Sequence, residues 1–256
     1  MGIEYNGQSF HGWQTQQLGV RTVQNCVEKA LSQVANEAIT VFCAGRTDAG
    51  VHALEQIIHF ETTAIRAERN WLLGVNVNLP KDISIVWIKA VEEDFHARFS
   101  AQARTYRYLI LNQQSRSALY YGRVTWSHRP LDATIMHEAA QSLVGTWDFS
   151  SYRALACQAK SPIKTVEYIK ITRQNAFIIL DIKANAFLHH MVRNIAGVLI
   201  TIGRGEQPAL WSKTILDYKD RRKGGVTAKP DGLYFKKVDY PAQYQLPQSS
   251  SLFDLI

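Results

Sequence analysis

The side chain best placed to do chemistry in this sequence is Asp48, which lies within the segment Gly45–Ala53. Strand-like runs at 39–44 and 55–61 flank this segment, so it should form a loop whose ends are held by a sheet. Two glycines bracket the loop, and glycine adopts backbone angles that other residues avoid. We therefore expect the main chain to approach a ligand closely and to hold one carboxylate at the loop tip.

The neighbours of Asp48 leave two interpretations open. An aspartate before Ala-Gly readily forms a turn, because its side chain accepts hydrogen bonds from nearby main-chain N–H groups. Alternatively, if the backbone is extended, Arg46 lies two residues away on the same side and can pair with Asp48, which would keep the carboxylate ionised. Such a carboxylate can act as a nucleophile or stabilise positive charge.

Positive charge is concentrated in parts of the chain, whose net charge is +7. The 37 residues from Phe95 to Leu131 contain six arginines and no acidic residue, and aromatic residues alternate with them. A second basic cluster comprises Lys219, Arg221, Arg222, Lys223, Lys229, Lys236 and Lys237. Arginines that bind phosphate, together with rings that stack on exposed bases, are typical of RNA recognition. A basic surface without a partner is the simpler alternative.

Composition excludes several classes of protein. With 256 residues, 46% hydrophobic and 20% charged, the chain resembles an ordinary soluble protein of one large or two modest domains. No apolar run approaches the ~20 residues that span a bilayer, and no basic-then-apolar leader is evident, so we expect no membrane association and no export. Three widely spaced cysteines indicate reduced, structural thiols and a cytoplasmic location.

Known cofactor motifs are not found in the sequence. The zinc-deaminase pattern of His-x-Glu followed by Pro-Cys-x-x-Cys is missing, because no Pro-Cys-x-x-Cys occurs, and the Gly-x-x-x-x-Gly-Lys-Ser/Thr loop of nucleotide-dependent enzymes is missing as well. The eight histidines show no His-x-x-x-His spacing, so packing or RNA contact is a better interpretation than metal ligation. We therefore expect a reaction that needs no metal, no nucleotide and no other cofactor.

Hydrophobic periodicity predicts an α+β protein. The expected helices cover 23–34, 66–75, 136–143, 187–202 and 209–219. The expected strands cover 39–44, 55–61, 83–92, 103–112, 164–173, 176–184 and 232–238. The pattern changes near Ser100, which suggests an N-terminal half at 1–100 with the Asp48 loop and a C-terminal half at 101–256 with the basic RNA-binding surface. Antiparallel sheets covered by helices on one face are expected in both halves.

The segment Gly45–Ala53 resembles the active-site signature of the TruA-type tRNA pseudouridine synthases, and five further segments resemble that family in the same order. They are 5–14, Phe95–Ala101, Arg104–Tyr108, Phe187–Gly197 and Pro230–Phe235. Two departures are a first strand a few residues short of the family pattern and a last stretch, Tyr244–Ile256, without a match. The resemblance implies two related halves that join their sheets across a cleft, a homodimer, and tRNA as substrate.

The resemblance also implies roles for individual residues. Asp48 would be the catalytic residue that allows uridine to be isomerised to pseudouridine at positions 38, 39 and 40 of the anticodon stem-loop. Tyr106 would contact the flipped uracil, and Arg46 would fill the vacated stack or orient Asp48. Arg193 would pair with Asp48, and Leu233 would form an apolar wall. From sequence alone, Tyr106 could equally be a half-buried strand residue and Arg193 a helix-surface residue.

Two other classes of function compete with an enzyme. A non-catalytic module that binds structured RNA would explain the arginines and aromatic residues equally well. It would not need Asp48, because a negative charge at a polyanion site opposes binding. An oligomeric scaffold would show large exposed apolar stripes, and the sequence does not clearly contain them.

Overall fold

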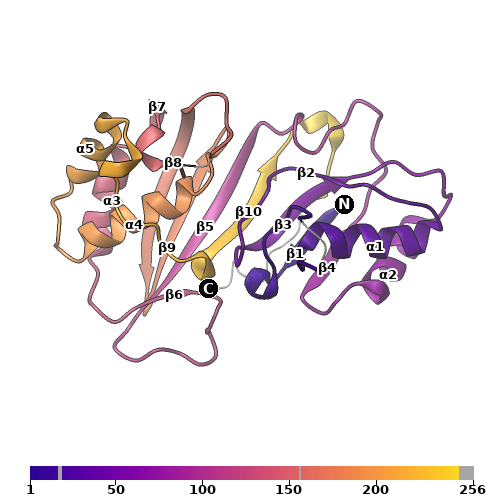
Figure 1. The fold of residues 1–256 in the computed structure, drawn as a ribbon, viewed down its shortest axis with the longest axis horizontal. Helices are drawn as coiled ribbons and strands as arrows, with labels where there is room; N and C mark the ends of the chain where they lie inside the picture. The colour runs from indigo at the N-terminus through magenta and orange to yellow at the C-terminus, as the bar shows by residue number, and fades with distance from the viewer. Residues whose placement is uncertain (17–18, 156, 248–256) are drawn as a thin grey trace. The chain divides into compact units, whose positions relative to one another are not determined.

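The computed structural model describes residues 1–16, 19–155 and 157–247, which form two compact units (Figure 1). Unit 1 contains residues 1–102 and returns at Tyr234, and unit 2 contains Ala103–Leu233. Both units combine helices with a mostly antiparallel sheet, so the predicted α+β class is confirmed. The first unit ends near the expected boundary at residue 100. The last strand, which the sequence assigned to the C-terminal half, is grouped with unit 1.

The sheet of unit 1 has the strand order β4-β1-β3-β10, and β2 pairs with β3. Its strands are β1 (Gly2–Tyr5), β2 (Phe42–Cys43), β3 (His52–His59), β4 (Ile83–Trp87) and β10 (Leu233–Asp239). All pairs are antiparallel except β3 with β10, where Tyr234 lies opposite His52. A strand from near the end of the sequence therefore lies beside the strand that leaves the Asp48 loop.

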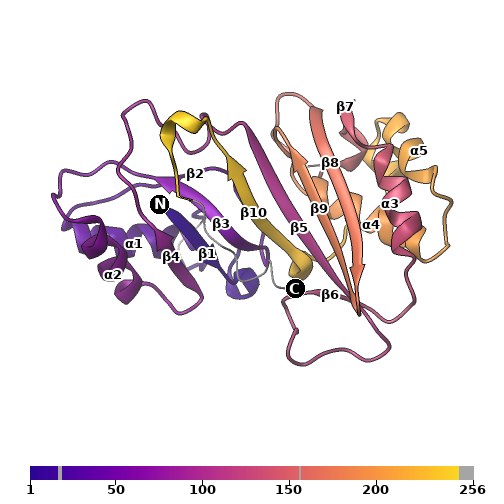
Figure 2. The ribbon, with the colours of Figure 1, turned by 180° about the vertical axis from the view of Figure 1, so that it is seen from behind.

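Two helices, α1 (Val23–Ala35) and α2 (Glu68–Asn78), pack side by side in unit 1, as Figures 1 and 2 show. Thr22 caps α1 by accepting a hydrogen bond from the Asn25 N–H. The buried residues of α1 follow helical spacing, so this helix covers the core with one face. Helix α2 stops at Leu79, because Pro80 cannot continue a helix.

The strand expected at 39–44 is reduced to the two residues of β2, and the reason is local. The main-chain N–H groups of Ile39 and Val41 donate to Ser32 Oγ at 2.9 Å and Glu28 Oε1 at 3.1 Å. Both acceptors belong to α1, so these donors are satisfied by a helix and not by a neighbouring strand. The apolar pattern of residues 39–44 predicts a strand, whereas most of this segment forms a partly buried connection between α1 and β2.

The sheet of unit 2 has the order β5-β9-β8-β7, with β6 paired parallel to β5. Its strands are β5 (Ala103–Asn112), β6 (Thr125–Ser127), β7 (Gly145–Asp148), β8 (Ile163–Gln174) and β9 (Phe177–Ala184). The predicted strand at 103–112 is confirmed without a change of bounds. The predicted strands at 164–173 and 176–184 are also confirmed, and β8 and β9 form an antiparallel hairpin around Asn175, whose φ of +53° makes the turn.

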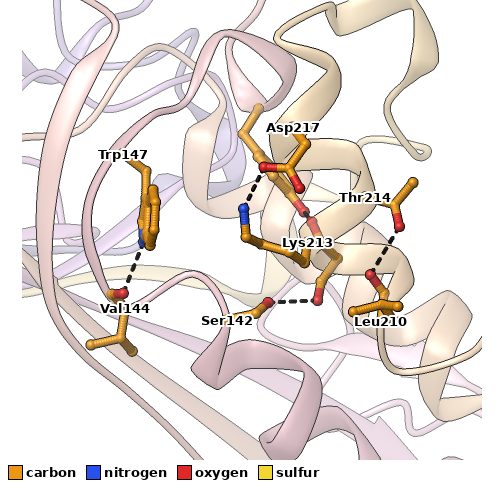
Figure 3. Close-up of polar contacts among 9 residues, drawn as sticks. Ser142, Val144, Trp147, Leu210, Lys213, Thr214 and Asp217 are labelled. Carbon is orange, nitrogen blue, oxygen red and sulfur yellow. Dashed lines mark hydrogen bonds and ion pairs between the residues drawn. The ribbon is translucent and has the colours of Figure 1, made fainter.

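Three helices of unit 2 pack against one another: α3 (Ala133–Gln141), α4 (Met191–Gly203) and α5 (Trp211–Tyr218). Figure 3 shows where α5 meets the end of α3, and Ser142 Oγ lies 2.9 Å from Ser212 Oγ there. Beside this contact the Trp147 indole N–H donates to Val144 O at 2.9 Å, and the Lys213 ammonium lies 4.8 Å from the centre of the Trp147 ring. These contacts attach α5 and β7 to the helical layer.

Helix α4 begins four residues later than the predicted start at 187. His190 has a φ of +62°, and the Met191 N–H donates to Leu188 O at 3.0 Å. A left-handed residue interrupts the hydrogen bonds of a right-handed helix, so His189 and His190 form a turn before α4. The interpretation of His189 and His190 as residues of the helix itself was therefore wrong.

The remaining short helices are of the 3-10 type. They are η1 (Gly7–Ser9), η2 (Ser150–Tyr152), η3 (Arg221–Lys223), η4 (Pro230–Gly232) and η5 (Ala242–Tyr244). Among the described residues, every helix is too short or too polar to cross a membrane. The expectation that 244–256 lacks a family match falls mostly on 248–256, which lie outside the described residues.

His59, at the end of β3, should make the stability of the protein depend on pH. Its Nδ1 accepts the Ala97 N–H at 3.1 Å, and desolvation by burial, with His96 nearby, lowers its pKa from 6.5 to about 4. The unfolded chain therefore binds a proton at His59 first as pH falls, so stability present above pH 6.5 is lost toward pH 4.

Replacing His59 by Gln should flatten this pH dependence between pH 6.5 and 4 in urea unfolding experiments. The control is His128→Gln, which removes an imidazole from an exposed position of the protein. An equal slope for the unmodified protein and His59→Gln would contradict the assignment.

Candidate active site

Asp48 lies on the connection between β2 and β3, as the sequence predicted, and its side chain is half-buried. The Val51 N–H donates to Asp48 O at 3.1 Å and closes a turn there. Gly50, with a φ of +79°, provides the left-handed step that lets the chain enter β3. The carboxylate is therefore held at the tip of a turn whose two sides are fixed in the sheet of unit 1.

The residue before the catalytic candidate, Thr47, is buried and held on two sides. Its Oγ1 lies 2.7 Å from the hydroxyl of Tyr5 on β1, and its carbonyl oxygen accepts the Trp13 N–H at 3.0 Å. Burial raises the pKa of Tyr5, although hydrogen bonds with Thr47 and Gln56 oppose that rise. The Tyr5 hydroxyl thus stays protonated near neutral pH and holds the loop by hydrogen bonds.

The segment after β1 braces the other side of the loop. The Gly50 N–H donates to Phe10 O at 3.2 Å, and the Gly7 N–H donates to His52 Nδ1 at 3.0 Å. Residues 5–14 matched the family pattern in the sequence without a role being assigned to them. The structure shows that part of this segment supports the Asp48 loop.

The strand β10 supports the loop from behind. A Cβ atom on Gly45 would lie 2.8 Å from the ring of Phe235, which is fully buried. The neighbouring rings of Tyr234 and His52 stack with their centroids 4.7 Å apart. Glycine at position 45 is therefore required by close packing against β10, a contact that no local sequence pattern predicts.

Three further site residues predicted from the sequence lie in unit 2. Tyr106 is on β5, is 8% exposed, and meets the ring of Phe187 edge-on with centroids 4.9 Å apart. Leu233 is buried at the beginning of β10. Arg193 lies in the first turn of α4, half-buried, and its Nε donates to Ala228 O at 2.9 Å. Arg193 is therefore not the freely solvated helix-surface residue considered as its alternative.

Arg46 is exposed next to the buried Thr47, and its pairing with Asp48 stays a prediction. Burial raises the pKa of the neighbouring Cys43 thiol to about 12, which makes it a poor nucleophile at neutral pH. Asp48 thus stays the predicted catalytic residue of this loop.

Removing the hydroxyl pair behind the loop should impair catalysis more than binding. Both Tyr5→Phe and Thr47→Val should lower kcat about tenfold, the equivalent of ~1.4 kcal/mol in the barrier, with KM for substrate nearly unchanged. Each variant should also lose about 0.5–1.5 kcal/mol of unfolding free energy with the hydrogen bond. Thr47→Ser, which keeps the hydroxyl, is the matched control.

The double variant tests whether the hydroxyls of Tyr5 and Thr47 act together. If the hydroxyls act together, Tyr5→Phe combined with Thr47→Val should cost little more than either change alone. Steady-state kinetics and urea unfolding measure both effects. Strictly additive losses, or a rise in KM with kcat retained, would exclude a positioning role.

The chain is similar to known proteins along nearly its whole length. The model of the tRNA pseudouridine synthase family matches residues 1–100 and 139–241. A relative from Nitrosococcus oceani named tRNA pseudouridine synthase A is 58% identical over 250 residues, covering 98% of this chain and 96% of that protein. Relatives of the same name from Pseudomonas aeruginosa and Cronobacter sakazakii are 55% and 57% identical over 248 residues. They cover 97% of this chain and 87% and 92% of their own lengths.

A half-buried carboxylate on a braced loop of a basic α+β chain is an arrangement that suits an enzyme acting on nucleic acid. The comparisons identify the family of the protein, because the relatives match nearly the whole chain. The chain belongs to the tRNA pseudouridine synthase family, whose members are isomerases that convert uridine to pseudouridine.

Proposed function

We propose that this protein isomerises uridine at positions 38, 39 and 40 of the tRNA anticodon stem-loop, with Asp48 as the catalytic residue. Family membership supports the reaction and the tRNA substrate. The observation that carries the assignment of Asp48 is the braced loop. Tyr5 and Trp13 fix Thr47, and a tight turn then presents the next side chain.

The reaction conserves the atoms of the nucleotide. The N1–C1′ bond breaks, the uracil rotates, and a C5–C1′ bond forms, while C5 loses its proton and N1 gains one. No redox partner or group donor is required. An ionised carboxylate serves this sequence of steps either as a nucleophile, at C1′ or C6, or by stabilising the positive charge of a glycal route.

Other residues receive supporting roles in this proposal. The target base must leave its stack to be reached, and an aromatic ring such as Tyr106 suits contact with a flipped uracil. Arg46, exposed beside the loop, fills the vacated stack or orients Asp48, and Arg193 pairs with Asp48. Leu233 supplies a buried apolar wall. The working protein is a homodimer in the cytoplasm, which sedimentation and fractionation would test.

Two measurements test the function. Incubation with tRNA tritiated at uridine C5 should release tritium, because C5–H is replaced by C5–C1′. An RNA-binding module without chemistry would bind the same tRNA and release none, so tritium release separates the two functions.

The position of modification is tested in cells that lack the protein. Their tRNAs should lose pseudouridine at positions 38, 39 and 40 in many different sequences, because arginines and lysines that contact phosphate carry little base identity. Sequencing of pseudouridine in total tRNA measures this. Loss at one position of one tRNA, or loss outside the anticodon stem-loop, would contradict the proposal.

A further inference from the structure

The loop between β5 and β6, residues 113–124, has an unusual surface. It carries Arg116 and Arg123, both exposed, and belongs to the stretch from Phe95 to Leu131 that contains no acidic residue. Residues 101–138, which include this loop, lie outside the part of the chain that the family model matches. Neither the family model nor the names of the relatives assign a role to this loop.

Hydrogen bonds and one ring contact give the loop a defined shape. The Trp126 indole N–H donates to Gln113 O at 2.9 Å and closes its base. The Arg123 N–H donates to Tyr120 O at 3.0 Å, which forms a turn near its end. The ring of Tyr120 packs edge-on against Phe177 of β9, with centroids 5.1 Å apart. These contacts hold the backbone of the loop in a defined conformation, so its side chains have defined positions.

Two large apolar side chains nevertheless face solvent on the loop. Leu119 is 85% exposed and Tyr121 is 70% exposed, although each would be stabilised by burial. Arg116 and Arg123 add positive charge nearby, and residues 113–124 contain no Asp or Glu. A patch that joins exposed rings with arginines complements a polyanion that also offers flat apolar faces. Single-stranded or looped RNA is such a partner.

We propose that the β5–β6 loop binds tRNA, with Arg116 and Arg123 contacting the phosphate backbone and the ring of Tyr121 stacking on an unpaired base. This contact is additional to the one that holds the target uridine, and it rests on the proposed function. It contributes to affinity for tRNA and leaves the chemical step unchanged. An alternative occupant of the patch is a second copy of this chain, and the experiment below separates the two.

Substitutions in the loop test the proposal through the kinetics of tritium release from full-length tRNA. Arg116→Ala should raise KM, retain kcat at saturating tRNA, and lower the slope of log affinity against log salt by about 0.7 to 0.9, the contribution of one phosphate contact. Tyr121→Ala should raise KM at least about fivefold, as expected for the loss of one stacked base. Tyr121→Phe keeps the ring and should retain the KM of the unmodified protein.

Lys170→Ala is the matched control, because Lys170 is an exposed cation of the same unit on β8. It should change KM and the salt slope less than Arg116→Ala does. Circular dichroism and thermal unfolding confirm that each variant folds. Equal effects of Arg116→Ala and Lys170→Ala, together with an unchanged KM for Tyr121→Ala, would overturn the role of the loop while isomerisation by the unmodified protein upheld the proposed function.

Sedimentation of the same variants tests the other occupant. If Leu119→Ser or Tyr121→Ala converts a dimer to a monomer and leaves the salt slope unchanged, the patch is a contact between subunits and the RNA proposal is wrong. Retention of the oligomeric state together with a raised KM supports RNA binding. Absence of tritium release by the unmodified protein would instead count against the proposed function itself.

Discussion

Replacing Asp48 by Asn should abolish tritium release from C5-labelled tRNA, with a loss of at least about 1,000-fold in turnover, as for other residues that act directly in chemistry. The amide has nearly the shape of the carboxylate but carries no negative charge, so neither nucleophilic attack nor charge stabilisation remains. The loop itself should keep its conformation, because hydrogen bonds of Thr47, Gly50 and the main chain of residue 48 support it.

Affinity for tRNA should survive this change or increase slightly, since a negative charge near phosphates opposes binding. Filter binding and urea unfolding, measured beside the kinetics, separate lost chemistry from lost binding or folding. Asp94→Asn is the matched control, because Asp94 is an exposed aspartate of the same unit and its replacement should leave turnover unchanged. Turnover by Asp48→Ala above a few per cent of the unmodified level would remove Asp48 from its catalytic role.

Binding of tRNA should weaken steeply with salt. If about 6 phosphates are contacted, log affinity should fall against log salt with a slope of magnitude roughly 4 to 5, because each contact releases condensed counterions. Raising monovalent salt from 50 to 200 mM should then reduce affinity by ~250- to 1,000-fold. The six arginines between Phe95 and Leu131 and the second basic cluster are the proposed contacts.

Activity should not depend on a metal ion. Tritium release in metal-free buffer should be the same with and without EDTA, because a carboxylate and the bound nucleotide supply every reacting group of the proposed steps. Affinity that hardly responds to salt would exclude a large phosphate contact. Activity lost to EDTA and restored by a divalent ion would show that a metal takes part in the reaction.

The helices and the hairpin were predictable because local residues decide them. Thr22 caps α1, Pro80 ends α2, and Asn175 turns β8 into β9, each within a few residues of the position it controls. The missing part of the 39–44 strand was not predictable in this way. Its main-chain donors bond to Glu28 and Ser32, and the pattern of apolar residues does not report such distant acceptors.

The candidate site also combines a feature that local residues predict with features that depend on residues distant in sequence. The position of Asp48 on a loop between two strands follows from glycines and flanking strands in one short segment. The contacts that support the loop do not follow from it, because Tyr5 lies 42 residues before Thr47 in sequence and Phe235 contacts the Gly45 position from near the other end of the chain. Resemblance to a family marked the segments that contain both residues, but only the three-dimensional contacts show what they do.

The parallel pairing of β10 with β3 also determines when the site is completed during synthesis. A nascent chain that has reached residue 230 already contains Tyr5, Thr47 and Asp48, yet it lacks Phe235 behind Gly45 and the ring that stacks on His52. Contacts of such long sequence separation form late, because the intervening chain must first be ordered. The protein therefore completes the packing around the Asp48 loop only after most of the chain has left the ribosome.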